Sequence, residues 1–345
     1  PPITWTGENG AAWETESNWD INEIPTVAHE AYLNNANTAV LSESGRQCAS
    51  LFLGTNIGDI GKLEILQGAS LNVAGGAYVG FAGLGTLNLA SGAQVSARTM
   101  TIGQHSSLQL HVGGADMVIL GNAAATGSMT NNGSIGLYAD AFLAGGSYTP
   151  ISAFSGGAPL WSGSGAVKAF GGEWRQSVLM FDVSPLIPLD AHSVHSVTSH
   201  DRLLITDPAS GDQVSVSFGD IAGTVNFSAS VVASGDQSAL EAILPTNWSL
   251  LAAWDFATNL PDGNEVFLAF EVGSDLDAFQ VWHLDGGVWS RFDPEFMSYD
   301  AAGGIAGFTV DGFSGYAVTT PEPGTLALLS LGGVIAMRRK RRRQK

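Results

Sequence analysis

Apolar and polar residues alternate through residues 58–122, and glycines interrupt the alternation at a fixed distance. The stretch GKLEILQGASLNVAGGAYVG is followed by GTLNLASGAQVSARTMTIG, so that Gly61 corresponds to Gly85 and Leu63 to Leu87, each 24 positions later. Within each unit every second residue is apolar, which is the periodicity of a half-buried β-strand. The segment therefore predicts short strands that return in register, with glycine at the corners.

A repeat of this length, with two or three short strands in each unit, is typical of a parallel β-solenoid. We predict such a solenoid over residues 38–150, in which each coil buries its apolar residues only when it is stacked on a neighbour. Leu63, Leu71, Leu87 and Val95 are expected to point inward. An antiparallel sandwich of β-hairpins is the alternative. It explains the alternation but leaves the fixed period without a cause.

Three tryptophans, Trp5, Trp13 and Trp19, mark the first 37 residues. Exposed tryptophans at this end could stack on sugar rings. Alternatively, they cover the open end of the solenoid, where an uncapped coil would expose apolar strand edges. The second interpretation is favoured, and residues 1–37 are predicted to form a cap or first coil.

The repeat fades after Pro150, and the pattern changes twice. Residues 151–174 are rich in glycine and serine and are predicted to be a connector. Residues 175–319 then hold short alternating segments at irregular spacing with turn sequences between them, which predicts an antiparallel β-sandwich. The expected strands are 177–183, 201–206, 213–218, 225–232, 265–272, 279–284, 288–292, 307–309 and 316–319. The predicted fold class is therefore all-β, a parallel solenoid followed by an antiparallel sandwich.

The composition agrees with this class and adds a strong asymmetry of charge. The chain has 345 residues, of which 44 are glycine and only 13% are charged. Seven of the 14 Lys and Arg residues lie in the last eight positions, so residues 1–337 combine seven basic with 32 acidic residues, a net charge of −25. Such a body repels nucleic acid, and no nucleic-acid partner is expected. Cys48 is the only cysteine, which excludes an intramolecular disulfide and a thiolate zinc site.

Two clusters of polar residues have the composition of metal ligands. His192, His195 and His200 lie close together, but the first two would point to opposite faces of a strand, and no carboxylate motif accompanies them. A solvated loop or edge is therefore preferred to a metal site. Asp275 and Asp277 lack the spacing of a known calcium loop, and a turn is preferred there. We expect no metal and no cofactor.

Catalytic patterns are also missing from the sequence. Solenoids that cleave polysaccharides carry clusters of charged residues on one face, whereas the charged residues here do not recur at one repeat position. Those of residues 58–122 are Asp59, Lys62, Glu64, Arg98 and Asp116. No serine lies in a Gly-x-Ser-x-Gly elbow, and no glycine-rich stretch opens a nucleotide-binding helix. We expect no enzyme, and no concave site that joins two carboxylates, or a nucleophile and a base, by a hydrogen bond.

The C-terminus, TTPEPGTLALLSLGGVIAMRRKRRRQK, joins three features in order. A Pro-Glu-Pro triplet precedes an apolar run at 324–337, which as a helix would span about 21 Å, short of the roughly 30 Å of a bilayer core. A basic cluster follows and should stay cytoplasmic, which leaves the acidic body outside. The predicted short transmembrane helix contains Gly324, Leu326, Leu328, Leu329, Leu331, Val334, Ile335 and Met337. The basic residues that would stop transfer are Arg338, Arg339, Lys340, Arg341, Arg342 and Arg343.

Residues 320–345 resemble the PEP-CTERM sorting signal of Gram-negative bacteria. The resemblance implies that exosortase, an integral membrane cysteine protease, recognises Pro321, Glu322 and Pro323 and that the tail is removed. It also implies an inner-membrane intermediate, followed by release to the cell surface or the extracellular matrix. The tryptophan-bearing opening and the repeats behind it are similar to surface proteins of the PEP-CTERM and autotransporter-associated kinds.

Together these patterns predict a non-catalytic surface or matrix protein, structural or adhesive in exopolysaccharide or biofilm. Its expected partners are an exosortase-type membrane protease, extracellular polysaccharide, and the membrane transiently through the tail. The alternative is a carbohydrate-binding or polysaccharide-active β-solenoid protein. A recurring cluster of acidic or aromatic residues on one exposed face would favour that alternative.

Overall fold

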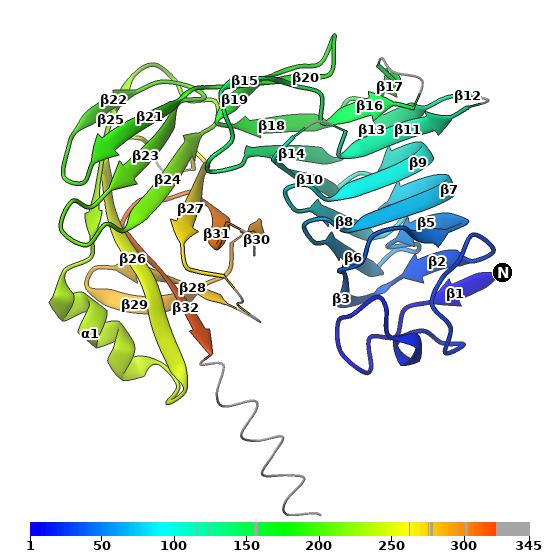
Figure 1. The fold of residues 1–345 in the computed structure, drawn as a ribbon, viewed down its shortest axis with the longest axis horizontal. Helices are drawn as coiled ribbons and strands as arrows, with labels where there is room; N and C mark the ends of the chain where they lie inside the picture. Colours follow the sequence, from blue (N-terminus) through cyan, green and yellow to red (C-terminus); the bar gives the residue numbers. More distant parts are fainter. Residues whose placement is uncertain are drawn as a thin grey trace, which may run out of the picture.

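Two parallel β-sheets lie back to back over the first half of the chain, and two further sheets form a sandwich beside them (Figure 1). The computed structural model describes residues 1–114, 116–123, 125–154, 158–261, 263–274, 276, 279–294, 296–300 and 303–321. The pair of parallel sheets is called the stack here, and the other pair the sandwich.

The stack consists of a long sheet and an inner sheet, and the inner sheet faces the sandwich. The long sheet has eleven strands: β1 (Pro2–Thr4), β2 (Glu30–Leu33), β4 (Arg46–Cys48), β5 (Ser50–Leu53), β7 (Ser70–Val79), β9 (Gln94–Ile102), β11 (Val118–Asn122), β12 (Ala125–Thr126), β13 (Ser128–Asn131), β16 (Ile151–Ala153) and β17 (Leu160–Ser162). The inner sheet has six: β3 (Asn35–Leu41), β6 (Ile60–Ile65), β8 (Leu84–Leu89), β10 (Ser107–Val112), β14 (Ser134–Ala139) and β18 (Ala166–Phe170).

The register of these strands follows the sequence repeat. Leu63 of β6 pairs with Leu87 of β8 in a parallel ladder, and Leu71 of β7 pairs with Val95 of β9 in the same way. All four side chains are at most 1% exposed and belong to one core between the two sheets. The predicted parallel stacking is confirmed, and the hairpin alternative is wrong for this region.

The repeated glycines lie where successive coils approach most closely. A Cβ atom on Gly61 would lie 2.2 Å from the carbonyl oxygen of Leu33, and one on Gly85 would lie 2.9 Å from the carbonyl oxygen of Leu53. Any side chain would therefore collide with the backbone of the neighbouring coil. Tight stacking explains why glycine recurs with the same period as the inward leucines.

Both ends of the stack are covered. Trp5, Trp13 and Trp19 are each at most 1% exposed, and Trp19 packs edge to face against Trp5 and Trp13 at ring distances of 5.2 and 4.7 Å. A 3-10 turn, η1 (Glu16–Asn18), leads into the last of these tryptophans. The burial of the three tryptophans removes them as a sugar-stacking surface and agrees with the capping interpretation, which stays a prediction.

A small antiparallel sheet closes the opposite end of the stack. It contains β15 (Gly146–Tyr148), β19 (Gly172–Arg175) and β20 (Met180–Val183), and Phe181 of β20 is fully buried in the core of the stack. The predicted connector at 151–174 is wrong, because β16, β17, β18 and β19 lie there and three of them extend the parallel sheets. The expected strand at 177–183 is shorter and belongs to this cap rather than to the sandwich.

The sandwich has two six-stranded sheets around a second core. The sheet that faces the stack has β21 (Leu186–Asp190), β23 (Arg202–Thr206), β24 (Gln213–Phe218), β27 (Val266–Glu271), β30 (Met297–Asp300) and β31 (Ile305–Val310). The outer sheet has β22 (His195–Val197), β25 (Val225–Val231), β26 (Trp248–Thr258), β28 (Gln280–Asp285), β29 (Val288–Phe292) and β32 (Gly315–Pro321).

Pairing in the sandwich is antiparallel, as predicted, except that β21 pairs with β23 in parallel. One helix, α1 (Ser234–Ile243), was not predicted from the sequence. It covers the outer sheet through the buried Leu240, and the indole nitrogen of Trp289 donates to the carbonyl oxygen of Asp236 at 2.8 Å.

The part of the chain that the structure describes contains no helix long and apolar enough to cross a membrane. The predicted transmembrane helix at 324–337 and the basic cluster after it lie outside the described residues.

Candidate functional site

The stack and the sandwich meet through a cluster of aromatic rings. Tyr138 of β14 stacks on Phe170 of β18 and on Phe296, with ring centroids 5.0 and 4.1 Å apart and planes within 7° of parallel. Phe267 of β27 closes the cluster at 5.1 Å from Tyr138. All four side chains are buried, so the two halves share an apolar contact at this end.

Arg202, the first residue of β23, joins the two halves through hydrogen bonds. Its side chain is fully buried, and its guanidinium donates to the carbonyl oxygens of Leu143 at 2.8 Å, Ser184 at 3.0 Å, Asp140 at 2.5 Å and Ala141 at 3.3 Å. Burial lowers the pKa of Arg202 to about 10, a shift that Asp140 opposes, so the side chain stays charged at neutral pH. A buried cation held by carbonyl oxygens fixes the loop after β14 to the sandwich.

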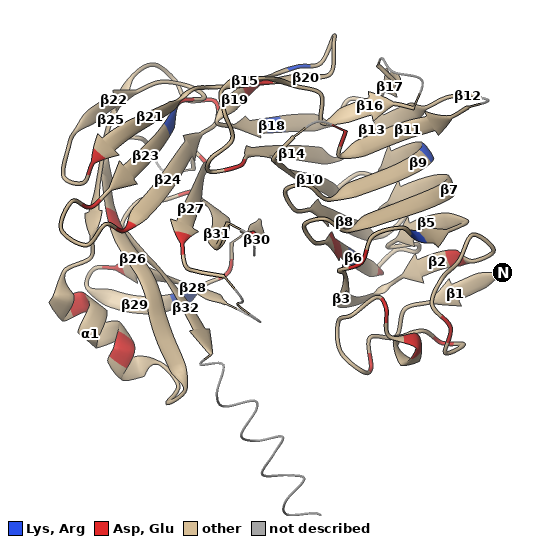
Figure 2. Cartoon of the chain, in the orientation of Figure 1, with Lys and Arg blue, Asp and Glu red and all other residues tan. Residues whose placement is uncertain are grey.

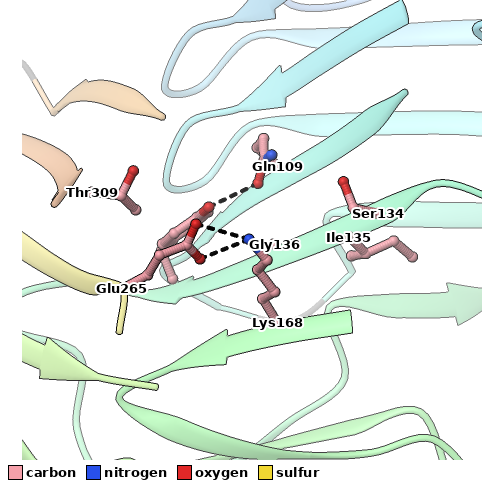
Figure 3. A pocket seen from close by; sticks show the side chains of 8 residues that line it. Gln109, Ser134, Ile135, Gly136, Lys168, Glu265 and Thr309 are labelled. Carbon is pink, nitrogen blue, oxygen red and sulfur yellow. Dashed lines mark hydrogen bonds and ion pairs between the residues drawn. The ribbon is translucent and has the colours of Figure 1, made fainter. Parts of the chain in front are cut away.

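Polar contacts continue along the same junction. Lys168 of β18 forms an ion pair with Glu265, with the Lys168 nitrogen 2.7 and 2.9 Å from the two carboxylate oxygens (Figure 3). The Tyr138 hydroxyl donates to the side-chain oxygen of Gln109 at 3.0 Å. The cavity between these residues has a volume of about 10 Å³, room for one water at most. This cavity is therefore too small for a ligand, whereas a cavity of about 300 Å³ lies on the other side of the Lys168–Glu265 pair, between β18 and the sandwich.

His111 of β10 lies at the junction without a hydrogen-bond partner. It is 1% exposed and packs edge to face on Phe267 at 5.5 Å, and neither ring nitrogen has a partner among the described residues. Burial lowers the pKa of His111, although the carboxylates of Asp140 and Asp300 oppose the shift. The ring is therefore neutral at neutral pH, and its two nitrogens remain unpaired.

The junction opens beside β3 and β6 into a cavity of about 310 Å³, called the cleft here. Val40, Glu64 and Leu66 line it from the stack, and Leu276, Phe279, Met297, Ser298 and Tyr299 line it from the sandwich. Burial raises the pKa of the Glu64 carboxyl. The cleft combines an ionisable group from the stack with aromatic walls from the sandwich.

A second feature lies on the outward face of the long sheet. Tyr32, Phe52 and Tyr78 pair with one another in register, and their rings stack with centroids 4.7 and 4.9 Å apart and planes within 10°. Phe81 stands perpendicular to Phe52 and Tyr78 and is 63% exposed. These four residues are called the aromatic ladder. It is a recurring aromatic cluster on one face, which the sequence did not reveal.

One serine and one histidine of the sandwich are joined by a hydrogen bond. The Ser314 hydroxyl lies 2.6 Å from Nε2 of His283, and His283 stacks on Tyr316 at 4.7 Å. The two side chains are within hydrogen-bonding distance, but the expectation concerned a nucleophile and a base in a concave site, and it stays a prediction. Neither residue lines the cleft or the cavity beside Lys168, so the pair is not placed in a concave site at the junction.

The remaining predicted site residues fall into two groups. His192 and His200 lie in turns, His195 lies on the edge strand β22, and Nε2 of His200 is 3.1 Å from a carboxylate oxygen of Asp220. The predicted loop or edge position of the three histidines is confirmed. Asp275 and Asp277 lie outside the described residues, as do Glu322 and Pro323 of the triplet.

Pro321 is the last residue of β32 and pairs with Trp248 of β26, so its extended conformation agrees with the sequence. The residues just before it are held in the outer sheet. Thr319 is fully buried and its hydroxyl accepts a hydrogen bond from the Trp282 indole at 3.0 Å. The folded body therefore continues into the Pro-Glu-Pro triplet without a linker.

Comparison with known proteins identifies the tail alone. Residues 319–343 match the model of the PEP-CTERM protein-sorting motif. No curated protein and no solved structure matches the chain. The motif supports export and sorting through a cleavable tail, processing by exosortase, and a surface or extracellular destination. The similarity of the repeats to autotransporter-associated proteins stays a prediction.

Proposed function

We propose that this protein is a non-catalytic structural or adhesive component of an extracellular polysaccharide matrix, delivered there by its tail. The match of residues 319–343 to the sorting motif carries the proposal. The capped stack and the sandwich form the body, and Figure 2 shows acidic residues distributed over both halves with few basic residues between them. The tail would pass through an inner-membrane intermediate, with its apolar run as a short helix and its basic cluster on the cytoplasmic side.

Replacing Pro321, Glu322 and Pro323 together by alanine is expected to leave the tail uncut and the protein in the inner-membrane fraction. Glu322 is the only charge of the triplet, and the prolines hold the chain extended for a protease. The measurement is fractionation of a host with an exosortase-type protease, followed by mass spectrometry of the secreted protein. Peptides from residues 326–345 should be absent from the wild type.

The matched control replaces Thr325, Ser330 and Gln344 by alanine, which keeps the triplet, the length of the apolar run and the basic cluster. This control should be processed as the wild type is. Tail peptides on secreted wild-type protein, or normal secretion of the triplet variant, would contradict the sorting mechanism.

Carbohydrate binding is the second candidate, and the aromatic ladder favours it. The Phe81 ring packs perpendicular to the rings of Phe52 and Tyr78, with ring centroids 6.5 and 5.7 Å away, and the side chain is 63% exposed. An exposed aromatic ring supported from behind is suited to packing against the apolar face of a sugar. We infer that the ladder is the contact surface of the body for polysaccharide.

Replacing Phe81 by alanine should weaken binding of the body to its host's exopolysaccharide by roughly three- to tenfold, as expected for one aromatic contact. Co-sedimentation with the purified polysaccharide measures the change. Replacing Ile57 by alanine is the control, because Ile57 is 92% exposed and apolar but not aromatic. Equal binding by both variants and the wild type would remove the ladder as the contact surface.

A further inference from the structure

Glu64 is a carboxylate in the wall of the cleft, and no other residue that the structure describes pairs with its charge. It points outward from β6, between Val40 of β3 and Asn88 of β8 in the parallel register. No hydrogen bond or ion pair joins Glu64 to another of the described residues. Lys62, the nearest base along the same strand, is exposed and forms no ion pair with it. Burial is the sole cause of the raised pKa of Glu64, which agrees with this lack of compensation.

Two neighbouring polar groups of the junction are also unpaired. Ser298 of β30 lines the cleft, is only 6% exposed, and its hydroxyl has no partner among the described residues. The side-chain oxygen of Asn88, beside Glu64 in the register, is buried and likewise without a partner. The carboxylate and the amide oxygen accept hydrogen bonds, and the hydroxyl can do so. Glu64 and Ser298 in the wall, with Asn88 beside it, therefore present acceptor atoms that no donor among the described residues satisfies.

Aromatic rings form the opposite wall. Phe279 and Tyr299 lie 6.2 Å apart with their planes at 55°. The Tyr299 hydroxyl donates to the carbonyl oxygen of Gly273 at 2.8 Å and accepts from the backbone nitrogen of Leu276 at 3.2 Å, so the ring is fixed in place. The faces of such rings attract cations.

We propose that the cleft binds an organic ammonium ion, with Glu64 as its counter-ion and Phe279 and Tyr299 as the walls that contact its carbon atoms. An ammonium group brings the positive charge and the N–H donors that the acceptors lack. A hydrated divalent cation fits less well, because such ions take six or more oxygen ligands and this wall is mainly apolar. The acidic body, with a net charge of −25 over residues 1–337, adds a field that attracts cations to the cleft.

The test is a ligand-observed NMR titration of the full chain with two matched pairs of probes. n-Butylammonium is compared with n-butanol, and glucosamine with N-acetylglucosamine, so that within each pair only one member is a cation. Both cations should bind and both neutral partners should not. Binding of n-butylammonium but not of glucosamine would restrict the ligand to simple amines and still support the site.

Two variants locate the binding. Replacing Glu64 by glutamine should weaken n-butylammonium binding by at least about tenfold, because a partly buried charge partner is lost while the shape is kept. Replacing Phe279 by leucine should weaken it by a smaller factor. The control is Glu241→Gln, which removes the same charge from an exposed position on α1 and should change nothing.

Three results would overturn the proposal: no cation binding at all, equal binding of the cation and its neutral partner, or unchanged affinity in Glu64→Gln. The second would mean that charge is not used, and the third that binding is elsewhere. After the first or the third result, the unpaired groups of the cleft would be satisfied by water alone. None of these results bears on the sorting tail, which is tested separately.

Discussion

Replacing Arg202 by methionine is expected to lower the free energy of unfolding by about 3–5 kcal/mol, because several buried carbonyl oxygens lose a charged hydrogen-bond donor. Methionine keeps an unbranched apolar stem but removes the guanidinium donor from the carbonyl oxygens of Asp140, Ala141, Leu143 and Ser184, of which Asp140 still accepts from the Leu143 nitrogen. These four carbonyl groups belong to the stack and its cap, whereas Arg202 belongs to the sandwich. The substitution therefore removes hydrogen bonds that join the two halves. Urea unfolding followed by tryptophan fluorescence should show a lower midpoint and separate transitions for the stack and the sandwich.

Arg175→Met is the matched control for this experiment. Arg175 forms an ion pair with Asp182 within the cap, and its side chain is 46% exposed. An exposed pair of this kind contributes about 0–1 kcal/mol. If the two variants lost equal stability, Arg202 would not be what joins the two halves.

Replacing Leu87 by aspartate should cost several kcal/mol, about 4 or more, and prevent the stack from folding stably at 37 °C. Leu87 is fully buried between Leu63 and Leu108 of the neighbouring coils. An aspartate there has no partner in the core. Each coil is stable only on its neighbours, so the defect should spread along the stack. Circular dichroism on thermal unfolding measures the loss.

Thr86→Asp adds the same charge one position earlier in β8, where the side chain lies on the outward face and is partly exposed. It should change the free energy of unfolding by about 0.5 kcal/mol or less, as surface substitutions usually do. A comparable loss in both variants would mean that burial of Leu87 is not what the stack depends on.

The stack was predictable because its information is local and periodic. Leu63 and Leu87 are one sequence repeat apart, and the register of β6 and β8 pairs them in adjacent coils. The prediction of parallel strands failed where the number of residues per coil changed. Leu108 pairs with Ile135 and Ile135 with Val167, 27 and 32 positions later, so the coils at this end carry longer loops. Their glycine and serine content made a region with four strands look like a connector.

The junction was not predictable for a different reason. Glu64 and His111 occupy positions that alternation places on the outside of a strand, and an outward polar residue is normally solvated. Whether a second sheet covers that face depends on the tertiary structure and cannot be read from the alternation of apolar and polar residues. Arg202 alone could have indicated a buried contact from the sequence. Basic residues are rare in the acidic body, and a charged residue at the start of a buried strand needs hydrogen-bond partners. The helix α1 was missed because ten residues with one buried leucine give little periodicity.

The aromatic ladder could not be predicted from the sequence either, because the loops between its strands differ in length. Tyr32 pairs with Phe52 and Phe52 with Tyr78, at separations of 20 and 26 positions, so no constant repeat connects them in the sequence. Only the register of the long sheet brings their rings into one column.

The direct passage from β32 into the triplet has a mechanical consequence. β32 lies between β26 and β28 and pairs with both in antiparallel ladders, whose hydrogen bonds run across the strand direction. While the tail is held in a membrane and the body is attached to the matrix, tension would act along β32. The tension would act in shear on the hydrogen bonds that join β32 to β26 and to β28, so that all of them carry the force together. They would not break one after another from one end of the strand. The protein would then resist being pulled apart on the slow timescale of forced unfolding, and cleavage after β32 would release the load without unfolding the body.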